Sequence, residues 1–285
     1  MIGQESYKEV NHFLNQELGK KKVLIAVHRG SSAGNIVENT IPAYEASLQM
    51  GGDIVEADVF KTSDDKLYHF HNGMERKNFQ KDFDIRRLSS QELKDLAYCN
   101  SNLSAISYPV EKLEDTLRYF KGRCLINIDR AWDFFSLVCD LVKKEEMVNQ
   151  VILKGPLEEE TLRFFAEEET KFLFMPKISK LSQLELLKQY PDVNIIGVEI
   201  KAETEADDFY QTENIQKLKE ANLCVWINAL TMNDEKKLFA GHDDNVSILK
   251  SEDEGWGILL EKGADIIQTD WPSLVSQYLV KRGII

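Results

Sequence analysis

Eight short runs rich in Val and Ile recur along the chain, and amphipathic stretches with helical spacing lie between them. Near-continuous apolar runs are typical of parallel strands that are covered on both faces. Strand followed by helix, repeated eight times without a Pro/Gly/Ser-rich linker, predicts one (β/α)₈ TIM barrel of the α/β class. The predicted strands are residues 23–27, 54–60, 124–128, 151–153, 172–175, 195–200, 224–227 and 265–268.

The chain has 285 residues, a length that suits a single domain of this kind, since such barrels commonly run to about 250 residues. We therefore expect residues 1–285 to form one domain, with residues 1–22 as a capping helix at the N-terminal end of the barrel. The predicted helices include residues 40–50, 110–120, 134–144, 158–167, 182–190 and 212–221.

One connection is too short for a parallel crossover. After residues 54–60, four to six polar residues lead directly into another strand-like run, residues 67–71, whereas a crossover needs about a dozen residues or more. The sequence therefore predicts a small β-hairpin insertion after the second strand, with its turn at residues 63–66. If Asp64 and Asp65 form the tip, Asp58 lies opposite His71.

The charge balance excludes one class of function. The chain carries 35 Lys and Arg against 48 Asp and Glu, a formal net charge of 35 − 48 = −13, whereas nucleic-acid binding usually needs a basic face. No window approaches the ~20 apolar residues of a membrane span, and the polar start resembles no secretory signal. The four cysteines form no CxxC pair, which favours reduced thiols. We expect a cytoplasmic protein.

Carboxylates mark the carboxyl ends of the predicted strands, where the active sites of such barrels lie. Glu56 and Asp58 share one face of the second strand, and Asp129 ends the third. Three carboxylates in one mouth need a cation or a shared proton, and oxygen ligands suit Mg²⁺, Ca²⁺ or Mn²⁺. Ion pairs with neighbouring Lys or Arg are the alternative. Four further residues at or near strand ends are candidates for substrate binding: Arg29, Lys154, Lys201 and Trp226.

Two of the five histidines, His28 and His71, are expected in the same mouth. A histidine pair on opposite sides of a scissile bond can supply a general acid and a general base near neutral pH. The three remaining histidines, His12, His69 and His242, are interpreted as structural. Arg29 and Lys154 add fixed donors for an anionic group such as phosphate.

In chain order these residues resemble the signature of the glycerophosphodiester phosphodiesterase family. The resemblance covers about residues 23–275 and is specific as a set. The matching segments are H-R-G at 28–30, E-N-T at 38–40, E-x-D at 56–58, T-x-D at 62–64, a strand-ending histidine at 71, L-x-x-x-E-L at 88–93, L-E-D-x-L at 113–117 and G-x-D-x-I-x-T-D-x-P at 263–272.

The resemblance implies roles for single residues. His28 and His71 would be the acid/base pair, and we take His28 as the base in a working assignment that the sequence does not decide. Arg29 would contact phosphate, and Asn39 belongs to the substrate-binding set. Glu56 and Asp58 would be metal ligands, with the third on the next strand.

The chain departs from the family pattern at several positions, among them the family's R-T-T segment, which reads R-K-N at 76–78. The third ligand is Asp129 where the family has Glu, and Ala131 stands where the family has Lys. The family's aspartate after the second histidine is Asn72 here. We expect Lys154 or Lys201 to replace the missing lysine.

The sequence thus predicts a hydrolase of phosphoric diesters. It would use one divalent cation, Mg²⁺ or Ca²⁺, with Mn²⁺ as a further option, to convert small-molecule glycerophosphodiesters into an alcohol and glycerol phosphate, a reaction of glycerol and lipid metabolism. Three alternatives stay open: a barrel phospholipase C or D that acts on lipids, a non-catalytic headgroup-binding module, and a structural barrel whose acids are all ion-paired. The sequence does not decide the headgroup, the metal, the nucleophile or the oligomeric state.

Overall fold

The computed structural model describes residues 1–285 as a closed barrel of eight parallel strands. Neighbouring strands follow the order β1-β9-β8-β7-β6-β5-β4-β2, and pairing between β1 and β2 closes the ring. The predicted (β/α)₈ architecture is confirmed. The barrel strands are β1 (Leu24–Val27), β2 (Ile54–Lys61), β4 (Leu125–Asp129), β5 (Val151–Pro156), β6 (Leu173–Ile178), β7 (Gly197–Ile200), β8 (Cys224–Asn228) and β9 (Ile266–Thr269).

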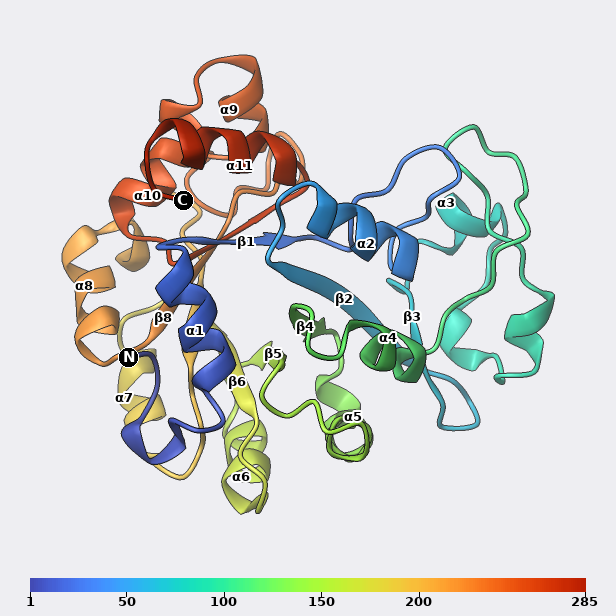
Figure 1. The fold of residues 1–285 in the computed structure, drawn as a ribbon, viewed down its shortest axis with the longest axis horizontal. Coiled ribbons are helices and arrows are strands. Elements are labelled where there is room, and N and C mark those ends of the chain that lie inside the picture. Colours follow the sequence, from blue (N-terminus) through green and yellow to red (C-terminus); the bar gives the residue numbers. More distant parts are fainter.

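Helices surround this barrel, as Figure 1 shows. Helix α2 begins where the Thr40 side chain accepts a hydrogen bond from the backbone N–H of Ala43 and Pro42 lies in the first turn, a favourable helix start. No helix combines the length and apolarity that crossing a membrane requires. The helices are α1 (His12–Lys20), α2 (Ile41–Gln49), α3 (Glu75–Phe79), α4 (Leu113–Phe120), α5 (Phe135–Lys144), α6 (Glu159–Glu167), α7 (Gln183–Lys188), α8 (Thr212–Glu220), α9 (Asp244–Leu249), α10 (Ile258–Lys262) and α11 (Pro272–Lys281).

The apolar interior is divided between two layers. The larger core, 48 buried residues, fills the space between strands and helices. A second cluster of 12 buried residues lies inside the barrel, and Leu14 of α1 belongs to it together with residues from all eight barrel strands or their immediate neighbours. Helix α1 therefore closes the N-terminal end of the barrel, and the polar residues gather at the opposite end.

Strand β3 (Leu67–His69) pairs antiparallel with β2 outside the barrel, so the predicted hairpin is present. Its register differs by one residue from the expected one, because Val59 pairs with His69 and Asp58 therefore lies opposite Phe70. The cause is the turn: three residues loop between Thr62 and Lys66, and Asp65 adopts a left-handed backbone (φ 57°).

The insertion is larger than a hairpin. Residues that follow β3 carry α3 and two short 3₁₀ turns, and they extend away from the barrel beside β2 and β3 (Figure 1). Nine buried residues, including Phe70, Phe79 and Tyr98, form a separate apolar core there, with the Phe79 ring stacked between the other two. This small core holds the segment after His71 in place.

The segment from residue 242 to 257 is rich in Asp and Glu. The structure places α9 and a π-helical turn, Asp253–Gly257, within it. Asp243 caps α9 by accepting a hydrogen bond from the backbone N–H of Val246, and Asp244 is buried. Part of this acidic segment is therefore a helix start.

Candidate active site

The expected carboxylates come together at the C-terminal end of the barrel. Strands β2 and β4 pair so that Asp58 lies next to Asp129, and Glu56 lies two residues earlier on β2. Glu56 and Asp58 are 1% and 3% exposed. Buried carboxylates of this kind need compensating charge, so the partners of each one decide what the site can hold.

Arg29 holds the two acids of β2. Its backbone N–H donates to Glu56 Oε2 at 2.9 Å, and its Nε lies 3.0 Å from Asp58 Oδ2. Arg29 itself adopts a left-handed backbone (φ 56°), a strained conformation for a residue with a side chain. Gly30 follows with φ 75°, and a Cβ there would lie 2.7 Å from the backbone of Ala43. This turn directs the guanidinium back toward β2.

Asn39 orients Asp58 from within the protein. Its Nδ2 donates to Asp58 Oδ2 at 3.1 Å, and its Oδ1 accepts from the Asp58 backbone N–H at 2.9 Å and from the Tyr44 hydroxyl. Asn39 is 1% exposed. The structure therefore gives this predicted substrate-binding residue a positioning role.

The three carboxylates have different electrostatic environments. Burial, followed by the charge of Asp58, raises the pKa of Glu56 to about 7. Burial also raises the pKa of Asp129, but Lys177 and Lys154 outweigh it, so the net shift is downward. Lys177 lies 2.9 Å from both oxygens of Asp129. Asp129 is thus neutralised within the protein, whereas Glu56 has no cationic partner in contact.

Whether a divalent cation fits here depends on which carboxylate oxygens have no protein partner. Arg29 and Asn39 contact only Oε2 of Glu56 and Oδ2 of Asp58, so one oxygen of each carboxylate accepts no hydrogen bond. Both oxygens of Asp129 contact Lys177. No group of three or more His, Cys, Asp or Glu side chains is arranged to hold a metal ion. The structure therefore does not assemble the expected three-carboxylate set, and it leaves two carboxylates available.

His28 follows β1 and forms a dyad with Asp270, which follows β9. His28 Nδ1 lies 2.9 Å from Asp270 Oδ1, so the Nδ1 proton is donated to the carboxylate and Nε2 is left free. Burial lowers the pKa of His28, but the hydrogen bond to Asp270 and the charge of Glu56 outweigh burial and raise it overall. The raised pKa favours the protonated form of this histidine.

Asp244 fixes the segment that carries Asp270. One oxygen of Asp244 accepts hydrogen bonds from Trp256 Nε1 at 2.7 Å and from the Thr269 hydroxyl at 2.8 Å, and the other accepts from the backbone N–H of Asp270 at 3.0 Å. Burial raises the pKa of Asp244 to about 7 despite these donors. This buried acid therefore fixes the end of β9 through Thr269 and Asp270.

His71 has the opposite surroundings. Arg130 Nη1 donates to His71 Nε2 at 3.2 Å, and the same guanidinium contacts the Asn72 side chain at 2.8 and 3.1 Å. Burial, then the nearby charges of Arg29 and Arg130, lowers the pKa of His71. Its Nδ1 is buried without a hydrogen-bond partner. His71 is therefore a neutral imidazole near pH 7, with one polar atom left unpaired.

His69 has the structural role that the sequence suggested. It is fully buried, Nε2 lies 2.8 Å from the Thr116 hydroxyl, and Nδ1 lies 3.3 Å from the Asp58 carbonyl oxygen. Burial lowers its pKa to about 4, so it is neutral at physiological pH. It supports the end of β2 from the hairpin.

The far side of the mouth is paired internally. Lys154, 1% exposed, lies 2.6 Å from Glu199 and 3.6 Å from the centre of the Trp226 ring. Trp226 is fully buried and donates its Nε1–H to Gln268 at 3.0 Å. Lys201 instead contacts Glu203 at the surface. Trp226 thus lies beneath the mouth, and Lys201 is engaged outside it.

The lysine that contacts Asp129 is Lys177, and neither Lys154 nor Lys201 takes that place. The apolar run in the sequence predicts a strand that ends at residue 175, whereas β6 continues to Ile178 and so brings Lys177 to the mouth. Arg130 was missed as well, although its left-handed backbone (φ 62°) brings it back toward His71. A polar residue two positions after the expected strand end was the signal for Lys177.

The fold of this chain is similar to the folds of several solved structures. One is a glycerophosphoryl diester phosphodiesterase from Parabacteroides distasonis (TM-score 0.74, 18% identity, 91% of this chain and 87% of that chain). Another is the enzyme from Agrobacterium tumefaciens (0.63, 22%, 90% and 99%). A third is a phosphodiesterase from Oleispira antarctica in complex with the product sn-glycerol-3-phosphate (0.64, 17%, 90% and 96%).

These similarities show that the chain has the barrel fold of the glycerophosphodiester phosphodiesterases of known structure. Within the sequence, residues 174–279 match a family described as a domain of unknown function, DUF4996. A search of curated proteins finds no match. The matched segment covers β6 to α11, the part of the barrel that contains Lys177 and Asp270.

Proposed function

We propose that this protein hydrolyses glycerophosphodiesters to an alcohol and glycerol phosphate. The observation that carries the proposal is the placement of two histidines with opposed surroundings around one pair of acids. His28 follows β1 and His71 follows β3, and both of these strands pair with β2, which bears Glu56 and Asp58. The shared fold with enzymes of this activity, one of them holding sn-glycerol-3-phosphate, supports the substrate class.

The acid and base roles follow from the neighbours of each histidine. His71, whose pKa is lowered, is the base: its Nε2, which accepts from Arg130 in the free protein, takes the proton of the attacking hydroxyl once the substrate displaces that contact. His28, whose pKa is raised with Asp270 on Nδ1, is the acid that donates its Nε2 proton to the departing alkoxide as the P–O bond breaks. These roles reverse the working assignment made from the sequence. Arg29 contacts the phosphate oxygens.

Glu56 and Asp58 would hold a divalent cation, Mg²⁺ or Ca²⁺, through the oxygens that Arg29 and Asn39 leave free. When bound, such a cation would neutralise a non-bridging phosphate oxygen and stabilise the charge that develops during the reaction. Two protein carboxylates suit Mg²⁺ in particular, since it keeps several waters and commonly also binds substrate phosphate. The role of Asp129 is to fix Lys177 beside this site.

Hydrolysis of a diester panel tests the proposal. Purified protein is assayed on glycerophosphodiesters with Mg²⁺, Ca²⁺, Mn²⁺ or chelator, and the products are analysed for glycerol phosphate and cyclic glycerol phosphate. The cyclic product distinguishes attack by the neighbouring glycerol hydroxyl from attack by water. Turnover only on micellar lipids would favour a phospholipase, and tight binding without turnover would favour a headgroup-binding module.

Two isosteric variants test the metal site. Glu56→Gln should abolish cation binding measured by calorimetry. Asp129→Asn should weaken binding only about tenfold, the low end for residues that support a ligand from outside the coordination shell. Equal losses in both variants would contradict the two-carboxylate arrangement.

The acid assignment has its own test. A diester with a p-nitrophenyl leaving group needs little protonation, so His28→Ala should lose much less activity on this substrate than on an alkyl diester. His71→Ala should lose similar activity on both. The reverse result would return His28 to the role of base.

A further inference from the structure

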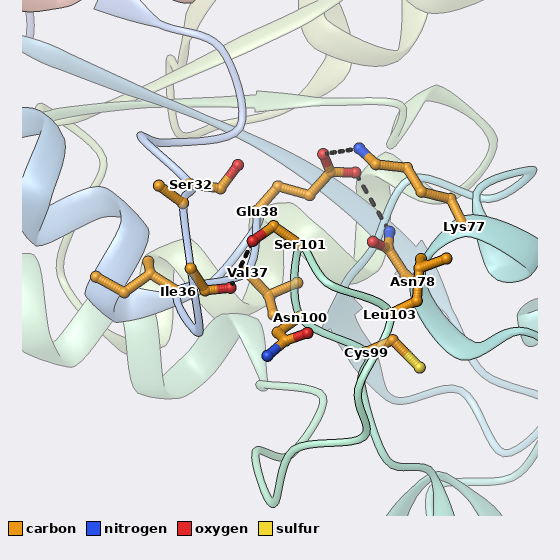
Figure 2. A pocket seen from close by; sticks show the side chains of 12 residues that line it. Ser32, Ile36, Val37, Glu38, Lys77, Asn78, Cys99, Asn100, Ser101 and Leu103 are labelled. Atoms are coloured by element: carbon orange, nitrogen blue, oxygen red, sulfur yellow. Dashed lines mark hydrogen bonds and ion pairs between the residues drawn. The ribbon is translucent and has the colours of Figure 1, made fainter.

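A cavity of about 160 Å³ lies beside the histidine-bearing segments (Figure 2). One wall is the loop from residue 32 to 38, which begins four residues after His28. The other wall comes from Lys77 and Asn78 of α3, six and seven residues after His71, and from residues 99–103 of the insertion. The two segments that carry the proposed acid and base thus also build this cavity.

Glu38 connects the cavity to the reaction centre. Its carboxylate lines the cavity, and Oε1 lies 3.5 Å from Arg29 Nη1. Arg29 is the proposed phosphate contact and also pairs with Asp58. A diester whose phosphate lies on Arg29 therefore has one of its two ester substituents next to Glu38.

The charge of Glu38 is cancelled within the protein. Lys77 Nζ donates to Oε2 at 2.8 Å and Asn78 Nδ2 to Oε1 at 3.3 Å, as Figure 2 shows. Burial raises the pKa of Glu38, but Lys77 and Arg29 outweigh burial and lower it, so the carboxylate is ionised and paired with two cations. The cavity offers no net negative charge to a cationic ligand.

No aromatic ring lines the cavity. Quaternary ammonium groups are recognised by the faces of aromatic rings and by acids that lack another partner. The lining instead includes hydroxyl groups of Ser32 and Ser101 and amide groups of Asn78 and Asn100, over an apolar floor that includes Val37. The Asn100 amide is bonded within the protein and Asn78 Nδ2 donates to Glu38, so the two hydroxyl groups and Asn78 Oδ1 are left for a ligand. Hydroxyl and amide groups both donate and accept hydrogen bonds, as the hydroxyls of a polyol do.

We infer that this cavity binds the leaving alcohol of the diester and favours an uncharged polyhydroxylated alcohol, such as glycerol or a cyclitol, over a cationic amino alcohol. The inference rests on the proposed function and specifies its substrate class. The volume, well above what one water molecule requires, suits an alcohol of this size. Lys77 is the residue that sets the preference, because it removes the negative charge of Glu38 from the cavity.

Headgroup preference in variants tests the inference. Values of kcat/KM are measured on glycerophosphoinositol, glycerophosphoglycerol and glycerophosphocholine. The wild type should favour the two polyol diesters, and Lys77→Gln should shift the preference toward choline by about tenfold, a typical effect of one specificity contact. Ser32→Phe, which fills the cavity, should reduce turnover of the inositol diester most. Ser182→Phe, at an exposed serine beside α7, is the matched control.

Cys99 provides a second measurement that needs no turnover. It lines the cavity and is partly exposed, whereas the other three cysteines are buried. Inositol should slow alkylation of Cys99 by iodoacetamide, and choline should not. Protection by choline but not by inositol would overturn the preference.

The outcomes separate the inference from the proposed function. Turnover with unchanged headgroup ratios in Lys77→Gln and Ser32→Phe would show that the leaving alcohol lies elsewhere. Equal losses on all three diesters would place the common glycerol half in the cavity and likewise overturn the inference. Absence of turnover on every diester would refute the proposed function, and protection of Cys99 would then still report whether a polyol binds.

Discussion

The carboxylates on the two sides of the barrel mouth differ in how many of their oxygens have protein partners. On the side of β1 and β2, Glu56 and Asp58 each keep one oxygen free of protein partners. On the side of β5 to β8, Lys154 contacts Glu199 at 2.6 Å, and Asn228 donates to the other oxygen of that carboxylate at 3.0 Å. The carboxylates beside the histidines therefore have oxygens free for a ligand, whereas both oxygens of Glu199 are paired within the protein.

This difference indicates that the first side binds ligand or takes part in a reaction and that the second side stabilises the fold. A buried carboxylate without a partner is costly, so it persists where a ligand or reaction uses it. A buried ion pair that is fully hydrogen-bonded instead keeps its surroundings in one arrangement, and losing one partner is expensive. We therefore expect substitutions on the first side to change activity and substitutions on the second side to change stability.

The largest effect is expected on the open side. His71→Ala should lower kcat about 10²- to 10⁴-fold, the range for a general acid or base, while the unfolding midpoint changes little. Steady-state kinetics on a glycerophosphodiester measure the loss. His12→Ala, at an exposed histidine on the opposite end of the barrel, is the control. Unchanged turnover of His71→Ala would remove His71 from the mechanism.

On the closed side, Lys154→Met should destabilise the fold by about 3 kcal/mol, because Glu199, only 14% exposed, is left without its main cation. Urea unfolding measures the loss, and adding Glu199→Gln should recover part of it. Lys188→Met breaks an exposed pair of the same 2.6 Å length and should cost less than about 0.5 kcal/mol. Equal costs for both lysines would mean that burial does not distinguish the two pairs.

Asp270 lies 2.9 Å from His28. For Asp270→Asn we expect about a tenfold loss of kcat/KM and a changed pH profile. The active form has His71 neutral and His28 protonated. Activity therefore rises as pH passes the lowered pKa of His71 and falls as pH passes the raised pKa of His28. Removing the Asp270 charge should move the alkaline limb to lower pH and leave the acidic limb in place. A profile that does not move would show that Asp270 only packs against the ring.

The smallest effect is expected at Lys201. Its contact with Glu203 is at the surface, and Lys201→Ala should change neither kcat/KM nor stability by more than about 0.5 kcal/mol. The same assays detect any change. A tenfold loss of activity would return Lys201 to the substrate-binding set that the sequence suggested.

Sequence periodicity predicts the barrel well because strands and helices repeat with distinct spacings that survive in any tertiary context. It also places Glu56 and Asp58 on one face, since i and i+2 on a strand share a side. The predicted hairpin register was wrong by one residue. Sequence does not show whether the turn contains two or three residues, and the left-handed backbone of Asp65 decides this in the structure. The core around Phe79 was not anticipated, because the residues after His71 show no regular period.

The partners within the site depend on packing that sequence patterns do not contain. The contact of Lys177 with Asp129 crosses β5, so it needs the strand order and the full length of β6. The dyad of His28 and Asp270 joins residues 242 positions apart. The two residues fall in separate sequence motifs, at 28–30 and 263–272, and nothing in either motif pairs them.

The long sequence separation between His28 and Asp270 has a consequence for folding during biosynthesis. Strand β9 is the last to be synthesised, and it pairs with β1, the first, in a register that sets Val27 beside Thr269. Until this final seam forms, His28 lacks its carboxylate and the ring of strands stays open. Catalytic competence would then appear late in biosynthesis, so recovery of turnover during refolding would report closure of the barrel itself.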